Sequence, residues 1–142
     1  MTGMDALDWD REYLWRFRAR LVSVTDGDTI VVLSDTGYRG RQEVALRIFG
    51  IDAPKMSTPE GKMAAHWLAS TLLWGRYGFS PWLLRVKTIQ RETVVTEVTS
   101  FERWVSRVWV VGEGGRLVDV AEALVKAGHA TPALREAQPN TT

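Results

Sequence analysis

The sequence predicts an α+β fold in which an antiparallel β-barrel carries packed helices. Six segments have the alternation or β-branched composition of strands. Two further segments space their apolar residues as amphipathic helices do, and most connections between segments are short. The 142 residues suit one domain that can bury a useful core without a metal or a disulfide.

Three strands are predicted in the first third of the chain. Period-two alternation over residues 13–24 predicts a long strand with aromatic residues on one side and three arginines, Arg16, Arg18 and Arg20, on the other. β-branched residues predict a second strand over 29–33, and a third covers 43–51. Asp26-Gly27 and Asp35-Thr36-Gly37 have the composition of turns between them.

The remaining two thirds alternate helix and strand. Thr58 and Pro59 have the composition of a helix start, and apolar residues at helical spacing continue toward a stop at Gly75. Strands are predicted over 83–89, 93–98 and 104–111. A second helix over 118–127 ends before Gly128.

Composition excludes several classes of protein. Lys and Arg total 18 against 17 Asp and Glu, so the net charge of +1 does not indicate a strongly basic nucleic-acid binder, although a local basic patch is compatible with it. The absence of cysteine excludes a disulfide framework and a thiolate nucleophile. No apolar run resembles a signal peptide or a membrane span, so we expect an intracellular protein with no membrane partner.

Three clusters carry residues that could do chemistry. They are Asp26-Gly27-Asp28-Thr29, the run from Arg47 to Pro54, and Arg103 within Phe101-Glu102-Arg103-Trp104-Val105. Taken singly, each has an ordinary structural interpretation: a common turn, a solvated ion pair and an arginine near a strand start. Their order and spacing along one chain are more informative than any one of them.

Together these clusters resemble the staphylococcal nuclease (thermonuclease-like) family over about residues 15–133. The resemblance includes the helix opening at Pro59 and the second helix that ends before Gly128. It implies a five-stranded OB-type barrel with packed helices. The predicted organisation is an N-terminal arm (1–12), a nuclease-like domain (13–133) and a polar C-terminal tail (134–142).

The resemblance also implies a site that hydrolyses phosphodiesters of DNA or RNA with Ca²⁺. Asp28 and Asp52 match the family's carboxylate ligands, and Ala53 offers the backbone carbonyl. Arg47 and Arg103 match the arginines that hold the phosphate and stabilise the charge of the transition state.

Lys55 stands where the family has a glutamate that activates or orients the attacking water. A lysine at neutral pH cannot accept a proton, and it makes the charge of the group −1 instead of −3. We therefore expect weakened Ca²⁺ binding and impaired hydrolysis. One hypothesis places the Lys55 ammonium beside Asp28 and Asp52, where it partly replaces the metal; the alternative is a mobile surface lysine. Glu60 could supply a base, but its position favours a role at the helix N-terminus.

The side that would recognise a base also departs from the family. Ser100-Phe101 replaces a Lys-Tyr pair, so Phe101 keeps a stacking face for a substrate base without the hydroxyl. The phosphate-binding half of the site is therefore better preserved than the base-binding half.

Aromatic residues are concentrated near the N-terminus, at Trp9, Tyr13, Trp15 and Phe17. We expect them to cover the barrel wall, with a protein interface as the alternative. Arg16, Arg18 and Arg20 suit either a solvated face or contact with a nucleic-acid backbone.

Three functions follow: a Ca²⁺-dependent endonuclease with impaired catalysis, a nucleic-acid-binding module, and a structural subunit of a larger assembly whose protein partners contact the arm and the tryptophans. Fold alone does not separate them.

Overall fold

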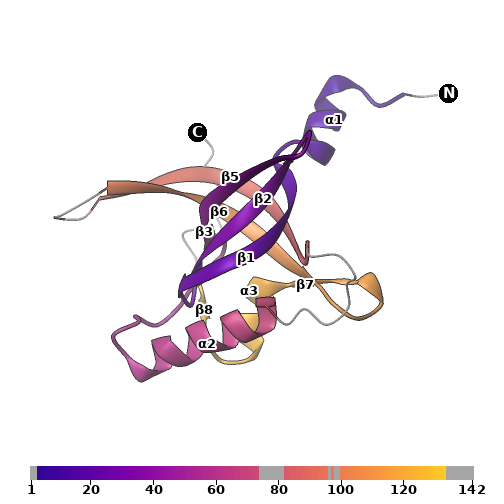
Figure 1. Ribbon diagram of the computed structural model, residues 1–142. Coiled ribbons are helices and arrows are strands. Elements are labelled where there is room, and N and C mark those ends of the chain that lie inside the picture. The colour runs from indigo at the N-terminus through magenta and orange to yellow at the C-terminus, as the bar shows by residue number, and fades with distance from the viewer. Residues whose placement is uncertain (1–2, 74–81, 96, 98–99, 134–142) are drawn as a thin grey trace.

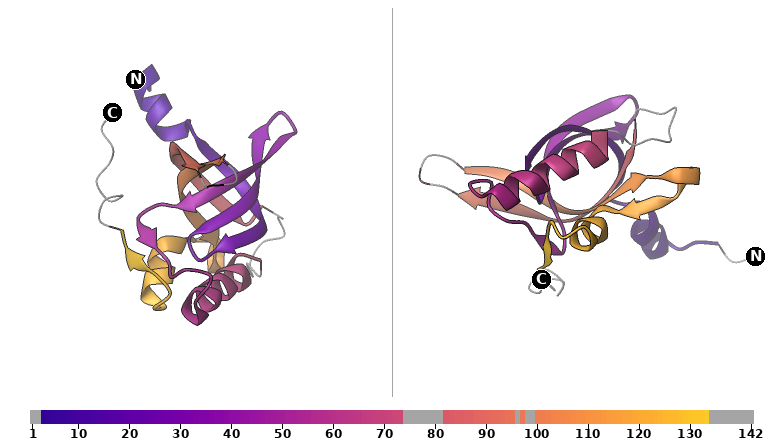
Figure 2. Two further views of the ribbon diagram at one scale, coloured as in Figure 1. Left: turned by 90° about the vertical axis from the view of Figure 1, so that its left-hand side faces the viewer. Right: turned by 90° about the horizontal axis from the view of Figure 1, so that it is seen from below.

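The computed structural model describes residues 3–73, 82–95, 97 and 100–133. Five strands form a closed barrel, seen along its axis in Figure 2. Their order is β3-β2-β1-β5-β6, and a β3–β6 pairing closes the ring. The strands are β1 (Arg16–Asp26), β2 (Thr29–Gly37), β3 (Gly40–Ile48), β5 (Leu84–Val95) and β6 (Ser100–Val111). The predicted barrel is confirmed, but it is not wholly antiparallel, because β3 and β6 pair in parallel.

Two helices lie at one end of the barrel and the third projects from the other end (Figure 1). Helices α2 (Pro59–Leu73) and α3 (Val120–Lys126) lie at the first end, and α1 (Ala6–Tyr13) projects from the second. The short elements are β4 (Ile51–Asp52), η1 (Glu113–Gly115), β7 (Leu117–Asp119) and β8 (Thr131–Pro132). Within the described residues, every helix is too short or too polar to cross a bilayer.

The hydrophobic core fills the barrel and continues under the two packed helices. Leucine, isoleucine and valine side chains from β2, β3, β5 and β6 are fully or almost fully buried, β1 contributes Ala19, and α2 adds Leu68 and Leu72. On β1, Ala19 is buried while Arg18 is exposed, as the alternation predicts. The polar side of β1 therefore forms part of the outer surface of the barrel.

Several strand boundaries differ from the prediction. β1 begins at Arg16 and not at residue 13, because Tyr13 belongs to α1. β3 covers Gly40–Ile48 and not 43–51, because a turn at Gly50, with φ of 88°, ends it. β6 begins at Ser100 and not at residue 104, because it pairs with the outer half of β5.

The region predicted as two strands before β6 also differs. The β5 strand is continuous, whereas two strands over 83–89 and 93–98 were expected; residue 98 lies outside the described residues. The outer half of the β5–β6 hairpin extends beyond the barrel (Figure 1), and its side chains are largely exposed. Alternation of apolar and polar residues is lost there because neither face is buried.

The hairpin turn between β2 and β3 lies later than predicted. Asp35, Thr36 and Gly37 belong to β2, and the tip consists of Tyr38 and Arg39, with φ of 53° and 64°. Two successive residues with positive φ suit the right-handed twist of a tight hairpin. The Asp35 carboxylate accepts the Gly37 N–H at 3.0 Å, a hydrogen bond typical of aspartate in turns. Here it lies just before the tip of the hairpin and not at the tip itself.

The N-terminal arm folds as α1, capped by Asp5, whose carboxylate accepts the Asp8 N–H at 2.8 Å. Trp9 and Tyr13 contact each other, with ring centroids 5.3 Å apart, and stay 51% and 52% exposed. The expectation that they cover the barrel wall is wrong, because the helix leaves the barrel instead of lying along it.

Helix α2 begins where the sequence predicts. The Thr58 hydroxyl accepts the Gly61 N–H at 3.0 Å and donates to the Lys55 carbonyl at 2.6 Å. This turn presses the Lys55 carbonyl against Gly61, where an added Cβ would lie 2.0 Å from that oxygen. The predicted stop at Gly75 lies outside the described residues. Helix α3 begins at Val120, later than predicted, because Asp119 caps it by accepting the Glu122 N–H.

We predict that Gly61→Ala destabilises the protein by about 2–4 kcal/mol. Alanine improves helix propensity by about 1 kcal/mol, but a Cβ this close to a backbone oxygen forces the turn apart. Urea unfolding measures the difference, and Lys62→Ala, at the exposed neighbouring position, should stay within about 0.5 kcal/mol of wild type. An unchanged midpoint for Gly61→Ala would contradict this packing.

Candidate functional site

The turn between β1 and β2 holds Asp28 in place. Gly27 is buried, and a Cβ on it would lie 2.7 Å from the Ala53 Cβ and 2.9 Å from the Ala64 Cβ. Only glycine lets the turn approach both the Ala53 loop and α2 this closely. The Asp28 carbonyl also accepts the Ile48 N–H at 2.8 Å, so the turn is fixed to the end of β3.

The Asp28 carboxylate accepts hydrogen bonds at both oxygens. Oδ2 accepts the Ala53 N–H at 3.1 Å, and Oδ1 accepts the Thr29 hydroxyl at 3.0 Å. Burial alone would raise the pKa of Asp28, but hydrogen bonds from Asp26 and Ala53 together with the Arg47 charge hold it below its ordinary value. Burial, with the nearby Asp28 carboxylate, raises the pKa of Asp26 to about 6. Asp28 is therefore the more acidic member of the pair, and Asp26 is the member that binds a proton first as the pH falls.

Arg47 bridges the two predicted carboxylates from a buried position on β3. Its Nη2 lies 2.6 Å from Oδ1 of Asp52 and 3.8 Å from Oδ2 of Asp28. The same nitrogen donates to the Ile51 carbonyl at 3.1 Å. A guanidinium with this many oxygens around it is held in one orientation.

Arg103 joins the same network through Thr29. Its Nε and Nη2 donate to Oε1 of Glu92 at 3.2 and 2.7 Å, and its Nη1 donates to the Thr29 hydroxyl at 3.2 Å. Strand register places these residues next to one another. Glu92 lies opposite Arg103 across β5 and β6, and Thr29 lies opposite Arg47 across β2 and β3. The Thr29 hydroxyl thus links Arg103 to Asp28.

These contacts form one continuous chain of polar side chains, which we call the acid–arginine chain: Asp52, Arg47, Asp28, Thr29, Arg103 and Glu92. It brings together the two expected carboxylate ligands, Asp28 and Asp52, and the two expected phosphate-binding arginines, Arg47 and Arg103, and the Ala53 N–H binds Asp28. Thr29 and Glu92 were missed. Thr29 stood inside the quoted turn, whereas Glu92 can be found only from the β5–β6 register.

Lys55 does not lie between the two aspartates. That position belongs to Arg47, whereas Lys55 is exposed and, among the described residues, its ammonium pairs with neither Asp28 nor Asp52. Its carbonyl is bound into the α2 cap, which the hypothesis of a metal-replacing lysine did not consider. Glu60 is exposed in the first turn of α2. Phe101 pairs with Val94 in the β5–β6 hairpin, and its side chain lies outside the described residues.

The contacts around Asp28 and Asp52 oppose the binding of a calcium ion. Ca²⁺ takes six to eight oxygens, and within the described ranges no three His, Cys, Asp or Glu side chains converge. Both Asp28 oxygens already accept hydrogen bonds, and Arg47 supplies the positive charge next to Asp52. A calcium ion at Asp28 and Asp52 would therefore compete with contacts that these carboxylates already make.

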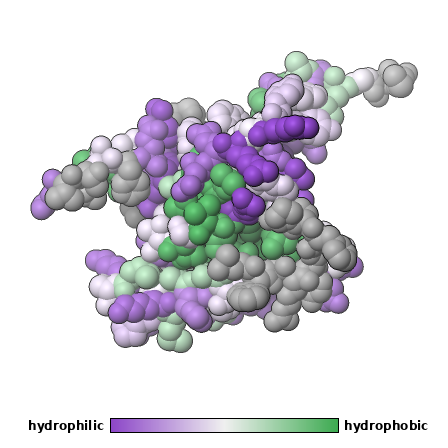
Figure 3. All heavy atoms as spheres, in the orientation of Figure 1, coloured by the Kyte–Doolittle hydropathy of each residue, from purple (hydrophilic) through white to green (hydrophobic). Residues whose placement is uncertain are grey.

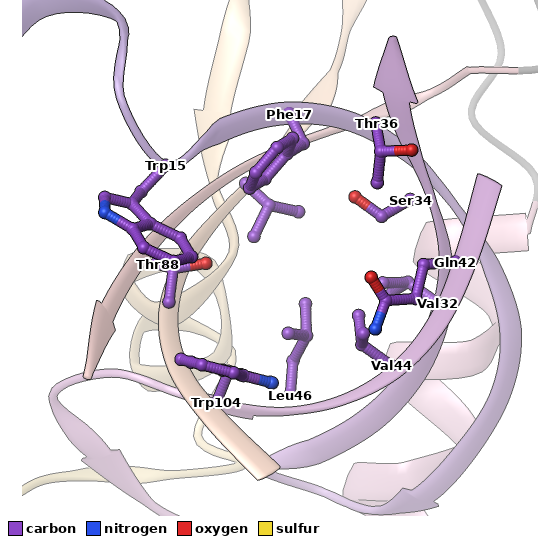
Figure 4. Close-up of a pocket in the computed structure, with 11 residues that line it drawn as sticks. Trp15, Phe17, Val32, Ser34, Thr36, Gln42, Val44, Leu46, Thr88 and Trp104 are labelled. Carbon is purple, nitrogen blue, oxygen red and sulfur yellow. The ribbon is translucent and has the colours of Figure 1, made fainter. Parts of the chain in front are cut away.

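Apart from the acid–arginine chain, a cavity of about 90 Å³ lies inside the barrel. Its lining includes Trp15, which follows α1 closely in the chain. Figure 4 shows the Trp15 and Trp104 rings at its side, with Phe17 pointing into the mouth. The two indoles stack with centroids 5.9 Å apart and an interplanar angle of 28°. Ser34, Thr36, Gln42 and Thr88 add polar atoms, and none of the described residues that line the cavity is charged. The described lining could bind a small ligand by shape and neutral hydrogen bonds, but it supplies no acid or base.

Neither a scan against models of known protein families nor a search of curated proteins finds a match to this chain. A functional inference therefore depends on the residues themselves and their geometry.

We predict that Thr29→Val destabilises the protein by about 1–3 kcal/mol, because valine leaves Asp28 and Arg103 without the hydroxyl that joins them. Thr29→Ser keeps the hydroxyl and should recover most of the loss. Denaturant unfolding of the three proteins at neutral pH provides the comparison. Equal stabilities for Thr29→Val and wild type would show that the link contributes nothing.

A pH-dependent stability difference should follow from Asp26. Its folded pKa of about 6 exceeds the ordinary 3.8, so its favourable contribution is complete below pH 4 and is lost as the pH rises through 6. Asp26→Asn keeps the acceptor for the Asp28 N–H and should stabilise the protein at pH 8 by about 1 kcal/mol, discounted for partial exposure. The gain should vanish near pH 4. Asp10→Asn on the exposed α1 is the control, and a pH-independent difference would contradict the argument.

Proposed function

We propose that this chain is a staphylococcal-nuclease-like domain with an OB-type barrel that binds nucleic-acid phosphodiesters at the acid–arginine chain, and that its Ca²⁺-dependent hydrolysis is impaired. The supporting observation is the convergence of residues that lie far apart in the sequence. Thr29 and Arg103 are 74 positions apart, yet their side chains are hydrogen-bonded. Asp28, Arg47 and Asp52 meet them at the same site.

A phosphate oxygen would bind here by exchange with a carboxylate. Arg103 donates three hydrogen bonds within the described residues, and a guanidinium has five N–H donors. The Asp52 side chain is 48% exposed, so it can turn toward solvent and leave its position next to Arg47 to a phosphate. Because each arginine already has an internal anion, this site alone should bind phosphate weakly.

Impaired hydrolysis follows from the absence of a suitable base. Lys55 replaces the glutamate of the family pattern, is exposed, and forms no ion pair with either aspartate among the described residues. Asp28 has a lowered pKa and two hydrogen bonds, so it accepts protons poorly. General-base assistance is typically worth about 10²–10⁴ in rate, and its loss leaves a slow enzyme.

A structural role is the second candidate, and the exposed aromatic residues of α1 favour it. Trp9 and Tyr13 remain about half exposed on a helix that projects from the barrel. Aromatic side chains of this kind are enriched in protein interfaces. Under this alternative the barrel is a scaffold, and the acid–arginine chain only stabilises it.

The test is cleavage of single-stranded DNA, with and without Ca²⁺, by wild type and Lys55→Glu. Wild type should be nearly silent, and Lys55→Glu should cleave about 10²-fold faster with Ca²⁺ because it restores a base and a negative charge. Adding Asp28→Ala should abolish that gain. Lys62→Glu, the same charge change on exposed α2, should remain silent.

Two results would contradict the proposal. Strong cleavage by wild type that Asp28→Ala removes would show that Lys55 is not disabling. Silence in every variant would favour the structural role.

A further inference from the structure

Like charges lie opposite each other on the outer side of the barrel. Arg16 pairs with Lys87 and Arg18 pairs with Arg85 across β1 and β5. Directly opposed like charges destabilise a sheet. Two such pairs in succession are therefore better explained by a role in binding than by a contribution to stability. Burial, and then the Arg18 charge, lowers the pKa of Arg85, so the repulsion reaches that side chain.

Two neighbouring arginines extend this surface around Trp82. The guanidinium carbons of Arg18, Arg20 and Arg41 lie 5.4, 5.5 and 5.4 Å from the centre of the Trp82 ring. Arg85 Nη1 donates to the Trp82 carbonyl at 2.7 Å and so fixes the backbone at this point. We call the whole surface the basic face: Arg16, Arg18, Arg20, Arg41, Arg85, Lys87 and Trp82.

Carboxylates balance only part of this charge. Strand register places Asp35 and Glu43 on the same outer side, next to Arg18, Leu33 and Arg41. Asp35 accepts from Arg18, and the hydrogen bond from Arg18 leads the causes that lower the pKa of Asp35. Six cations face two carboxylates, a local excess of four in a chain whose net charge is +1. On the view in Figure 3, hydrophilic side chains gather over the part of β1 and β2 nearer α1.

A groove runs beside these arginines. Its volume is about 320 Å³, and its lining includes Arg16, Arg18, Arg85, Trp109 and Leu117. Trp109 pairs with Arg85 across β5 and β6, and the Arg107 guanidinium lies 4.7 Å from the centre of its ring. Arg107 is neutralised by Asp119, at 3.0 Å, whereas Arg16 and Arg85 have no carboxylate partner within the described part of the chain. The groove thus combines uncompensated cations with an indole and an apolar wall.

We propose that the basic face and this groove bind single-stranded nucleic acid, with phosphates against the arginines and bases against the indole and guanidinium planes. Proteins that bind single strands combine these two features. An acidic peptide would use the charge but not the rings, and a duplex hides its bases. From β3 through β2, β1 and β5 to β6, four strand spacings of about 4.8 Å give a path of about 19 Å around the curved outer surface of the barrel. That path accommodates a short run of nucleotides.

The basic face is separate from the acid–arginine chain. Arg18 and Asp26 stand eight positions apart on β1, roughly 25 Å of extended strand. The inference therefore does not depend on the proposed catalytic ancestry, and each can fail without the other.

The experiment is fluorescence anisotropy of a labelled oligothymidylate of about 15 nucleotides, with the full chain, over a range of salt concentrations. Arg20→Gln/Arg41→Gln should weaken binding at least about tenfold and reduce the magnitude of the salt slope by about 1.4, since two phosphate contacts are lost. Arg91→Gln removes one charge at the outer end of β5 and should change the affinity less than about twofold. Thermal melting confirms that each variant folds.

A second pair of variants tests the aromatic contribution. Trp82→Ala should weaken binding about 5- to 100-fold, and Trp82→Phe should recover most of it at unchanged salt slope. A duplex of the same length and vesicles containing phosphatidylserine should bind more weakly than the single strand. Tighter binding of the duplex or the vesicles through the same arginines would overturn the proposal.

Arg103→Gln separates this surface from the acid–arginine chain. It should weaken oligothymidylate binding less than Arg20→Gln/Arg41→Gln does, because Arg103 is already paired with Glu92 and contributes little to phosphate binding. If Arg103→Gln abolishes binding and Arg20→Gln/Arg41→Gln does not, the basic face is not the binding surface, although the proposed function survives. If the basic-face variants lose binding while Lys55→Glu never cleaves, the basic face stands and the nuclease proposal fails.

Discussion

The burial of the Arg47 guanidinium is the interaction on which the closed end of this barrel depends. Arg47 sits at the seam, pairing with Thr29 on β2 and with Val105 on β6. A buried cation must have anionic and hydrogen-bonding partners, and Asp28, Asp52 and the Ile51 carbonyl provide them. Removing one member of such a buried group typically costs about 3–5 kcal/mol. One side chain therefore couples the β1–β2 turn, the barrel seam and the segment that leads to α2.

The sequence predicted much of the fold because most strands are buried on one side only. Alternation along β1 and the cap at Thr58 are local signals, and both are confirmed. The parallel β3–β6 closure and the short strands β7 and β8 leave no local signal, because pairing between distant segments determines them. The site divides in the same way. Asp28 and Arg47 could be identified from the order and spacing of their clusters along the chain, whereas Glu92 could be identified only from the pairing of β5 with β6. The sequence left two positions open for Lys55, beside the aspartates or on the surface, because adjacency in sequence does not specify the direction of a side chain; the structure has it exposed.

The two arginine-containing surfaces differ in how their charge is balanced. Arg47 and Arg103 are bound by Asp52 and Glu92, so an incoming phosphate must compete with anions already in place. On the basic face the sheet register opposes cations with cations, as at Arg18 and Arg85, and a phosphate relieves repulsion when it binds. Arginines on the two surfaces should therefore differ in how strongly they attract an added anion, because their neighbours differ. Net charge, which is close to zero, conceals this contrast.

This difference also provides a way for the two surfaces to act in sequence. Exchange of Asp52 for a phosphate at Arg47 requires free energy, since the half-exposed carboxylate must leave a buried guanidinium to which it is hydrogen-bonded. Several phosphates bound on the basic face can supply it, in the way that binding energy from remote parts of a substrate compensates for rearrangement at the reacting centre. A short ligand that contacts only the acid–arginine chain lacks that contribution. Under this argument a long single strand reaches Arg47 and Arg103 more readily than a dinucleotide does, although both present the same phosphodiester to them.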